Sequence, residues 1–222
     1  MQRIAREDVD VNSLTRRTRL IVAAAGCATA MLFVASPAAH AGLLVKSATN
    51  CTSPSLEKPF SRWYDNANYI KAPHGTFESG AADWSLKNAA ITTGNESYGV
   101  AGDRGSHSLL IQPGGSALTP TVCVGLDRPT LRFFAKSSAG LLSLSTMAVS
   151  VRFETSLGLV AELPVGVVLP NTKWQPSLPM PILVNLLPLL PGQMTPVQFR
   201  FIPVGGANWS IDDVYVDPKA RG

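Results

Sequence analysis

The stretch that most constrains the fold is residues 208–218, Asn-Trp-Ser-Ile-Asp-Asp-Val-Tyr-Val-Asp-Pro. Aromatic and β-branched residues dominate it, and a proline, which cannot donate to a β-ladder, ends it. The stretch is therefore predicted to be a closing β-strand. Because side chains alternate between the two faces of a strand, Trp209 and Ile211 share one face, whereas Val214 and Val216 share the other.

The change of face falls at Asp212-Asp213. If all four apolar side chains point into the core, the strand must slip by one residue there, which is the signature of a β-bulge. One carboxylate would then point into the interior, where an unpaired charge is costly. It would need an arginine, backbone N–H groups or a bound cation beside it, so this pair is the first candidate site.

Residues 1–41 are predicted to form a helical signal peptide. A basic flank at 16–19 precedes an apolar run at 20–35, and Ala39-His40-Ala41 forms an Ala-x-Ala exit before Gly42. This combination is typical of secretory signals that are cleaved after export. We therefore expect the mature protein to be secreted.

Three other interpretations of residues 1–41 fit less well. An uncleaved membrane anchor would need a longer apolar run without a cleavage site behind it. Arg16-Arg17 suits a twin-arginine signal, but Arg19 stands where that signal has an apolar residue. Cys27 resembles a lipid-attachment position, yet the chain stays apolar well beyond it.

Removal of the signal changes the charge and the cysteine content. Residues 1–41 hold five Arg and three acidic residues, so 14 of 19 basic and 12 of 15 acidic side chains remain and the net charge falls from +4 to +2. This balance gives no support to nucleic-acid binding. Cys51 and Cys123 remain as an even pair in an exported chain and are predicted to form one disulfide.

The remaining residues are predicted to form an all-β domain. The chain has 17 Pro, 18 Gly and only 15% charged residues, with almost no helical periodicity. Apolar and polar residues alternate in Thr130–Lys136 and Met147–Thr155, and Pro113-Gly114-Gly115 is predicted to be a turn. These patterns favour a sandwich or barrel of short strands.

An N-terminal extension, residues 42–72, precedes the predicted sandwich and is expected to be tethered to it by the disulfide. In one interpretation, its aromatic residues pack along the edge of the sandwich. In the other, Trp63, Tyr64 and Tyr69, together with Tyr98, form a platform for sugar rings, because aromatic faces with polar handles suit saccharides.

Residues 182–190, Ile-Leu-Val-Asn-Leu-Leu-Pro-Leu-Leu, are unusually apolar. Their short length and Pro188 exclude a membrane span, so none is expected after signal cleavage. They are interpreted either as a buried strand with a packed loop, or as an exposed patch that docks a partner or a second copy of the chain.

Two short motifs resemble a known family. Gly75-Thr-Phe-Glu-Ser-Gly80, followed by Trp84, and Trp209-Ser-Ile-Asp-Asp-Val-Tyr-Val216 together resemble the galactose-binding-like jelly rolls, especially the bacterial carbohydrate-binding modules of xylanases and glucanases. In that family, a Phe-Glu-x-Gly segment opens the domain and an Ile-Asp-Asp-Val strand closes it beside the first. The resemblance covers about residues 73–218, leaves 219–222 as a tail, and implies an antiparallel two-sheet jelly-roll sandwich.

The resemblance also implies a structural calcium ion held by the opening Glu, a closing Asp and backbone carbonyls. The matching positions are Glu78 and Asp212, with Asp213 as the second closing acid. Oxygen ligands from separate strand ends suit Ca²⁺, which accepts irregular geometry. Alternatively, Arg132 or Arg200 pairs with these acids, or the acids stay solvated.

The chain departs from the sugar-binding members of the family, which carry two or three aromatic residues on the concave face of a sheet. The strands that could supply this face present Ser150, Arg152, Gln198 and Arg200, with Phe134 as the outward aromatic residue. The resemblance therefore favours carbohydrate binding, whereas the missing platform counts against it.

No catalytic activity is predicted. His74 and His107 are the only histidines after residue 41, and the sequence has neither metal-ligand spacing nor a Gly-x-Ser-x-Gly elbow. The first hypothesis is a secreted, non-catalytic protein that recognises a cell-wall or environmental polysaccharide, with exposed, grouped aromatic residues. The alternative is a structural or interaction module that binds a cell-envelope protein and no sugar, with those residues buried and residues 182–190 exposed.

Overall fold

The computed structural model describes residues 45–48, 51, 55–102, 105–125, 129–183 and 194–217, all within one compact unit, Ala41–Gly222. The predicted signal peptide, the tail 219–222 and residues 184–190 of the apolar segment lie outside the described residues. At the start of that segment, Ile182 is buried and Leu183 is exposed.

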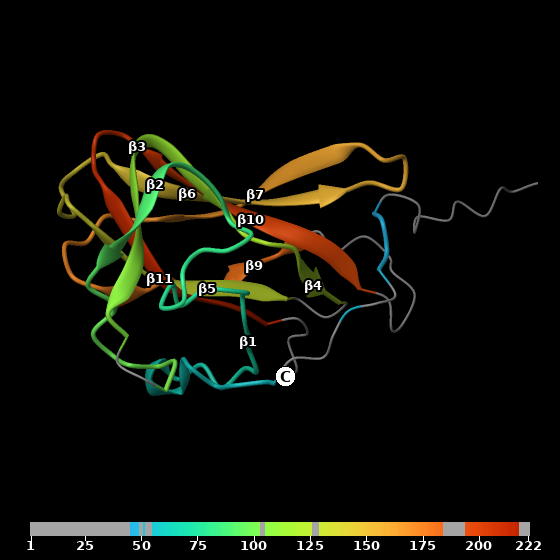
Figure 1. Cartoon of the computed structure of the whole chain (residues 1–222), viewed down its shortest axis with the longest axis horizontal. Coiled ribbons are helices and arrows are strands. Elements are labelled where there is room, and N and C mark those ends of the chain that lie inside the picture. Colours follow the sequence, from blue (N-terminus) through green and yellow to red (C-terminus); the bar gives the residue numbers. More distant parts are fainter. Residues whose placement is uncertain are drawn as a thin grey trace, which may run out of the picture. The chain divides into compact units, whose positions relative to one another are not determined.

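The described residues form an all-β fold (Figure 1). A 3-10 turn, η2 (Ser61–Trp63), precedes the strands. The strands are β1 (Ile70–Lys71), β2 (Ser85–Thr93), β3 (His107–Leu118), β4 (Val122–Val124), β5 (Thr130–Ser137), β6 (Thr146–Glu154), β7 (Val160–Val168), β8 (Gln175–Pro176), β9 (Met180–Pro181), β10 (Thr195–Val204) and β11 (Trp209–Asp217).

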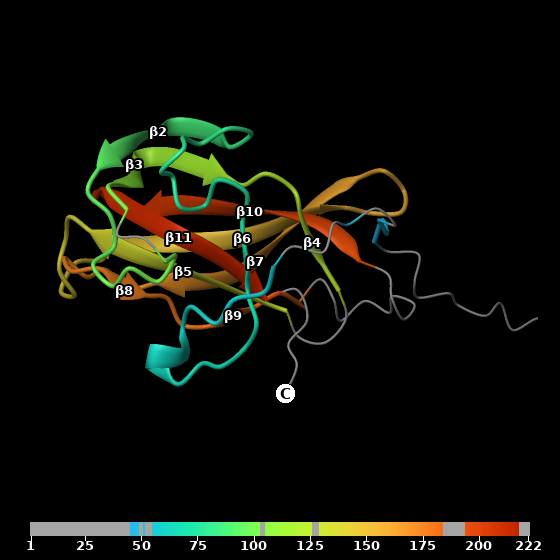
Figure 2. The same ribbon diagram turned by 60° about the horizontal axis from the view of Figure 1, so that its bottom comes forward.

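Antiparallel pairing joins the strands in the order β7-β6-β10-β3-β11-β5-β8. Outside this path, β1 pairs with β11, β2 with β3, β4 with β10 and β9 with β5. Figure 2 shows β2 and β3 along one side of the fold and β8 and β9 along the other. The pairing confirms the predicted antiparallel all-β class.

The sheet curls so that its two halves face each other as the layers of a sandwich. Phe133 on β5 and Phe201 on β10 have ring centroids 4.9 Å apart, although β3 and β11 lie between their strands in the order. The two predicted sheets are thus two layers that remain hydrogen-bonded, because β3 pairs with β11 at one end and with β10 at the other. Between them lies the main core, which includes Leu109, Phe133, Val151, Phe199 and Phe201.

The alternation predicted for 147–155 is confirmed in β6, where Val149, Val151 and Phe153 are buried and the residues between them are half-buried. The turn predicted at Pro113-Gly114-Gly115 is wrong, because β3 continues through it to Leu118. Gly114 has a φ of +73°, and the pairing with β2 shifts between Lys87 and Ala89. Its backbone freedom therefore serves an irregularity within the strand pair rather than a chain reversal.

The bulge predicted in the closing strand is confirmed. Pairing between β11 and β5 shifts between Asp212 and Tyr215, and Asp213 has a φ of +47°. Both apolar pairs of the strand therefore reach the main core, with Trp209, Ile211, Val214 and Val216 all buried.

The opening motif lies directly beside the closing strand. The Ala72 N–H donates to Val214 O at 2.9 Å, and the Val214 N–H donates to Gly75 O at 3.1 Å. A Cβ on Gly75 would lie 3.0 Å from the backbone oxygens of Ala72 and Val214, so this close approach favours glycine. The following residues Phe77 and Trp84 pack in the core with ring centroids 5.0 Å apart.

The predicted disulfide is confirmed. Cys51 and Cys123 are bonded, with a Cα–Cα distance of 6.0 Å. Cys123 lies in β4, which pairs with the start of β10. The bond therefore fixes the beginning of the extension to the edge of the sandwich.

Candidate functional site

A second apolar cluster lies on the outer face of the layer that contains β5 and β11. We call it the outer aromatic cluster: Phe60, Tyr69, Phe134, Trp174 and Tyr215, all buried. Phe134 and Tyr215 point outward because each alternates along its strand with a neighbour in the main core.

The N-terminal extension covers this outer face. Phe60 lies just before η2, and its ring centroid is 5.1 Å from that of Tyr69 and 5.7 Å from those of Phe134 and Tyr215. The extension also pairs with the sheet, because Ile70 in β1 lies opposite Val216 in β11. For these residues, the packing interpretation of the extension is the one that the structure supports.

A buried ion pair holds the extension against the sheet. Arg132 in β5 donates to Asp65 Oδ2 at 2.6 Å and to Ser177 O, and its guanidinium lies 4.2 Å from the ring centroid of Phe60. Burial raises the pKa of Asp65, but hydrogen bonds from Tyr69 and Arg132 outweigh burial, so the pKa lies below its usual value. The acid is therefore charged and fully paired at neutral pH.

The predicted sugar platform is only partly accessible. Tyr69 is 1% exposed and its hydroxyl donates to Asp65, so it presents no face to a ligand. Tyr64 is 96% exposed in a left-handed conformation at the end of η2. Trp63 and Tyr98 are half-buried and touch each other, with ring centroids 5.0 Å apart.

These side chains continue along the sheet as one row. The Tyr98 hydroxyl donates to the backbone oxygen of Trp174 at 3.1 Å, and Trp63 and Tyr98 both rest on Phe134 at 5.5 Å. We call Trp63, Tyr98 and Trp174 the aromatic row. Its outward parts belong to Trp63 and Tyr98, because Trp174 is 8% exposed.

A second group of side chains lies at the bulge of β11. We call Glu96, Asp212 and Asp213 the buried acid cluster, because they are 2%, 1% and 3% exposed. Asp212 accepts hydrogen bonds from the N–H groups of Glu96 and Asp213, at 2.9 and 2.8 Å. Asp213 forms a side-chain hydrogen bond with Glu96.

The acid cluster has perturbed acidity. Burial and, after it, the charge of Asp213 raise the pKa of Asp212 to about 8. Burial and the charge of Glu96 raise the pKa of Asp213 to about 7, although the Lys71 ammonium acts in the opposite direction. These carboxyl groups thus resist ionisation, because little positive charge faces them.

Glu96 was missed by the sequence analysis, although it connects the two candidate sites. Its carboxylate accepts hydrogen bonds from the N–H groups of Tyr98, Gly99 and Val100. This fixes the loop that places Tyr98 in the aromatic row. A local signal existed, since a glutamate two residues before Tyr98-Gly99 can cap a turn with its side chain, but burial of the carboxylate depends on the distant β11.

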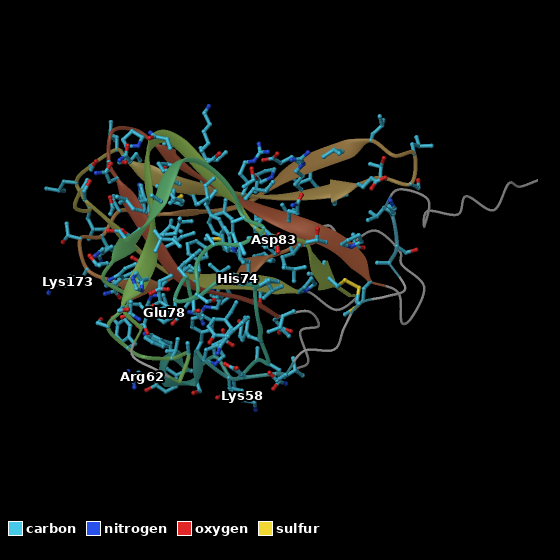
Figure 3. The ribbon with its side chains drawn as sticks, in the orientation of Figure 1. Lys58, Arg62, His74, Glu78, Asp83 and Lys173 are labelled. Carbon is cyan, nitrogen blue, oxygen red and sulfur yellow. A yellow bond between two sulfur atoms is a disulfide. The ribbon has the colours of Figure 1, made fainter. Side chains whose placement is uncertain are left out.

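Glu78 forms its hydrogen bonds with residues other than its predicted partners, Asp212 and Asp213. It accepts from the N–H groups of Ser106 and His107, both at 2.8 Å, and these bonds outweigh burial and lower its pKa. Its charge nevertheless contributes to the raised pKa of Asp213, so it lies within electrostatic range. Figure 3 labels Glu78 among the side chains near the extension.

The two arginines predicted as alternative partners bind other acids. Arg132 pairs with Asp65, and Arg200 pairs with Glu162 at 3.1 Å. Within the described residues, no three His, Cys, Asp or Glu side chains are arranged to hold a metal ion. No helix in this part of the chain is both long and apolar enough to cross a membrane.

No protein-family model and no curated protein matches the chain. Among solved structures, the CBM22-1 xylan-binding domain of Paenibacillus barcinonensis Xyn10C is 13% identical, with a TM-score of 0.47 over 77% of this chain and 100% of that chain. The CBM22-1-GH10 modules of Clostridium thermocellum xylanase 10B are 13% identical, with a TM-score of 0.48 over 69% of this chain and 29% of that chain.

A catalytic protein is also among the similar structures. The enzymatically active domain of bacteriophage CBA120 tailspike protein 4 is 17% identical, with a TM-score of 0.44 over 66% of this chain. The match spans 21% of that domain's length. These similarities concern the arrangement of strands and assign no ligand to this chain.

Proposed function

We propose that this chain is a secreted, non-catalytic protein that binds a polysaccharide at Trp63, Tyr64 and Tyr98. The observation that carries the proposal is the aromatic row, with two half-exposed rings beside a fully exposed tyrosine. Aromatic rings of this kind can stack on the apolar faces of sugar rings while polar groups at their edges bind hydroxyls.

The support beneath the row favours binding. Trp63 and Tyr98 rest on the buried ring of Phe134, and Phe60 packs against the same ring from the extension. A ligand would therefore meet rings that are already held in place, which lowers the entropy cost of binding. Tyr69 belongs to this support and takes no part in the contact.

The buried acids give no support to a glycosidase. Glycoside hydrolysis uses a carboxyl group on each side of the scissile bond, several ångströms apart in an open site. Asp212 and Asp213 are adjacent in one strand, and both are almost fully buried. We expect the protein to release no sugar from any polysaccharide that it binds.

A retention assay tests the binding proposal. The full chain is incubated with a panel of insoluble polysaccharides, and the bound fraction is measured. Trp63→Ala should weaken retention about tenfold, since a stacked ring contributes roughly 1–2 kcal/mol. Leu157→Ala, which removes an exposed apolar side chain beside β7, is the matched control. Retention on no polysaccharide, or equal retention of Trp63→Ala and the parent, would contradict the proposal.

We also propose that the acid cluster takes up the calcium ion implied by the sequence resemblance, through Asp212 and Asp213 with Glu78 nearby. Carboxylates are the hard oxygen donors that Ca²⁺ prefers. The raised pKa values of Asp212 and Asp213 support the proposal, because a nearby cation would stabilise their charged forms. Their present arrangement does not converge on a metal position, so uptake requires these side chains to rotate.

A structural or interaction module of the cell envelope is the second candidate function. Its support is an apolar edge, where Leu159, Val160, Leu163 and Val167 are all more than 40% exposed in or beside β7. Exposed apolar patches of this kind mark contact surfaces. Failure of all polysaccharides in the retention assay, together with capture of a cell-envelope protein that Leu163→Glu prevents, would favour this function over the first.

A further inference from the structure

We propose that the polysaccharide bound at the aromatic row is acidic, with carboxylate groups on its sugar units. This inference rests on the proposed function and specifies the class of its ligand. The observation behind it is the position of two cationic side chains at opposite ends of the row.

The first cation is Arg62, which lies in η2 and is exposed. Its guanidinium carbon lies 5.9 Å from the ring centroid of Trp63. The second is Lys136 in β5, whose ammonium lies 4.8 Å from the ring centroid of Trp174. Trp63 touches Tyr98, and Tyr98 is hydrogen-bonded to Trp174, so contacting residues connect the two cations, with Trp63 and Tyr98 as the exposed part.

Carboxylates near the row are already engaged. Asp65 is paired with Arg132, and Glu57 lies 3.4 Å from the ammonium of Lys71. Glu96 accepts hydrogen bonds from its own loop. Among the described residues, neither Arg62 nor Lys136 forms an ion pair with an acid.

Further positive charge lies on the same side. Lys58 precedes the extension's buried Phe60, and Lys173 precedes Trp174, and both are exposed. Figure 3 shows Lys58 and Arg62 pointing outward from the extension at the bottom of the view, and Lys173 pointing outward at its left edge. Exposed cationic side chains therefore lie near both ends of the row in the sequence, although residues 42–222 together are close to neutral.

Both cations lie within 6 Å of an aromatic ring, although the Arg62 side chain is exposed. A guanidinium or ammonium over an aromatic face is already oriented beside the place where a sugar would stack. A carboxylate on the next sugar unit would meet this charge without a large rearrangement of the protein. A neutral polysaccharide would offer neither cation a negative charge, so the arrangement favours an acidic one.

Homogalacturonan provides a probe whose charge can be varied on the same backbone, because its carboxylates can be methyl-esterified. The full chain is titrated with the de-esterified and the fully esterified polymer at low and high salt. We expect tighter binding of the de-esterified polymer and loss of this preference at high salt, since exposed charges are screened. Arg62→Gln/Lys136→Gln should weaken binding of the charged polymer about fivefold.

Two controls separate this inference from the proposed function. Lys87→Gln removes one exposed positive charge from β2, half of the charge removed by the double variant, and should leave binding unchanged. Trp63→Ala should weaken binding of both polymers, and melting curves confirm that each variant is folded. If both polymers bind equally and Arg62→Gln/Lys136→Gln has no effect, the acidic ligand is excluded while the binding function stands.

Two further outcomes would also contradict the inference. Retention on neither polymer, nor on any of the panel, would overturn the binding function and this inference together. A single-stranded oligonucleotide offers the same combination of stacking surface and negative charge. Tighter binding of an oligonucleotide than of de-esterified homogalacturonan would therefore overturn the acidic polysaccharide as the ligand.

Discussion

The partly buried Asp65 and the buried acid cluster lie near the same pair of strands, and they differ in what balances their charge. Asp65 faces the guanidinium of Arg132 at 2.6 Å, and its pKa is lowered. Asp212 and Asp213 face each other and Glu96, and their pKa values are raised to about 8 and about 7. Burial acts against the charged form in both groups, so the difference comes from the partners.

The Asp65–Arg132 pair has its counter-charge within the protein, and we call it the complete site. The buried acid cluster lacks a full counter-charge, and we call it the incomplete site. The Asp65 pair carries its own counter-charge, which suits a fixed role in attaching the extension. Among the causes that act on Asp213, the Lys71 ammonium is the one that lowers its pKa. The same ammonium donates to Ala101 O at 3.2 Å and pairs with Glu57 at 3.4 Å. The cluster therefore depends on something mobile, a proton or a cation, to reduce its charge.

The largest expected effect comes from breaking the complete site. Arg132→Met leaves Asp65 charged and partly buried, and should lower the free energy of unfolding by about 3–5 kcal/mol. Arg200→Met is the matched control, because Arg200 pairs with Glu162 at the surface and should contribute less than about 1 kcal/mol. Denaturant unfolding measures both, and equal losses would show that the buried pair has no special role.

Calcium should complete the second site. At pH 8, Ca²⁺ at about 100 times its dissociation constant should stabilise the chain by about 2.7 kcal/mol over the chelated protein. Asp212→Asn/Asp213→Asn should abolish this gain because it removes the two central carboxylates. A melting temperature that calcium leaves unchanged would contradict calcium binding. Protonation would then be what reduces the charge of the cluster.

Protons should act on the second site in the same direction. Because the folded pKa values exceed those of the unfolded chain, the folded state binds more protons between about pH 4 and 8. Stability in chelator should therefore increase as the pH falls from 8 to 5.5, because both carboxyl groups bind protons in the folded state that they do not bind in the unfolded chain. The Asp65 pair acts in the opposite sense, but only below about pH 4, where its carboxylate becomes protonated.

The same double variant provides the control for this pH dependence. Asp212→Asn/Asp213→Asn lacks the two buried acids and keeps every other side chain of the parent. It should show a flatter profile than the parent in chelator. If the parent and the variant have the same slope, the acid cluster does not control stability in this window.

The sequence predicted the local features of the incomplete site but not which residues form it. The change of side-chain parity around Asp212-Asp213 indicated the bulge, because alternation is a local property of the strand. Glu96 could not be found in this way, since its contact with Asp212 joins residues that are far apart in the chain. Glu78 was assigned from its motif, and the structure places its hydrogen bonds on Ser106 and His107 instead.

The complete site shows a similar limit. The outward direction of Arg132 and Phe134 followed from the alternation of β5, but their partners come from the extension, which has no regular periodicity. Burial of Tyr69 removed one of four predicted platform residues, whereas Tyr64 is exposed. Alternation predicts which face a side chain takes, and only the tertiary fold decides what covers that face.

The smallest expected effect tests the partial counter-charge directly. Lys71→Met removes the ammonium that lowers the pKa of Asp213, and should cost less than about 1 kcal/mol at pH 8, since Lys71 is partly exposed. At pH 5.5 the cost should shrink, because Asp213 is then protonated and needs no cation. Urea unfolding at both pH values measures the difference, and bound calcium should reduce it at pH 8. A loss that is the same at both pH values would place the role of Lys71 in its pairing with Glu57 rather than in the acid cluster.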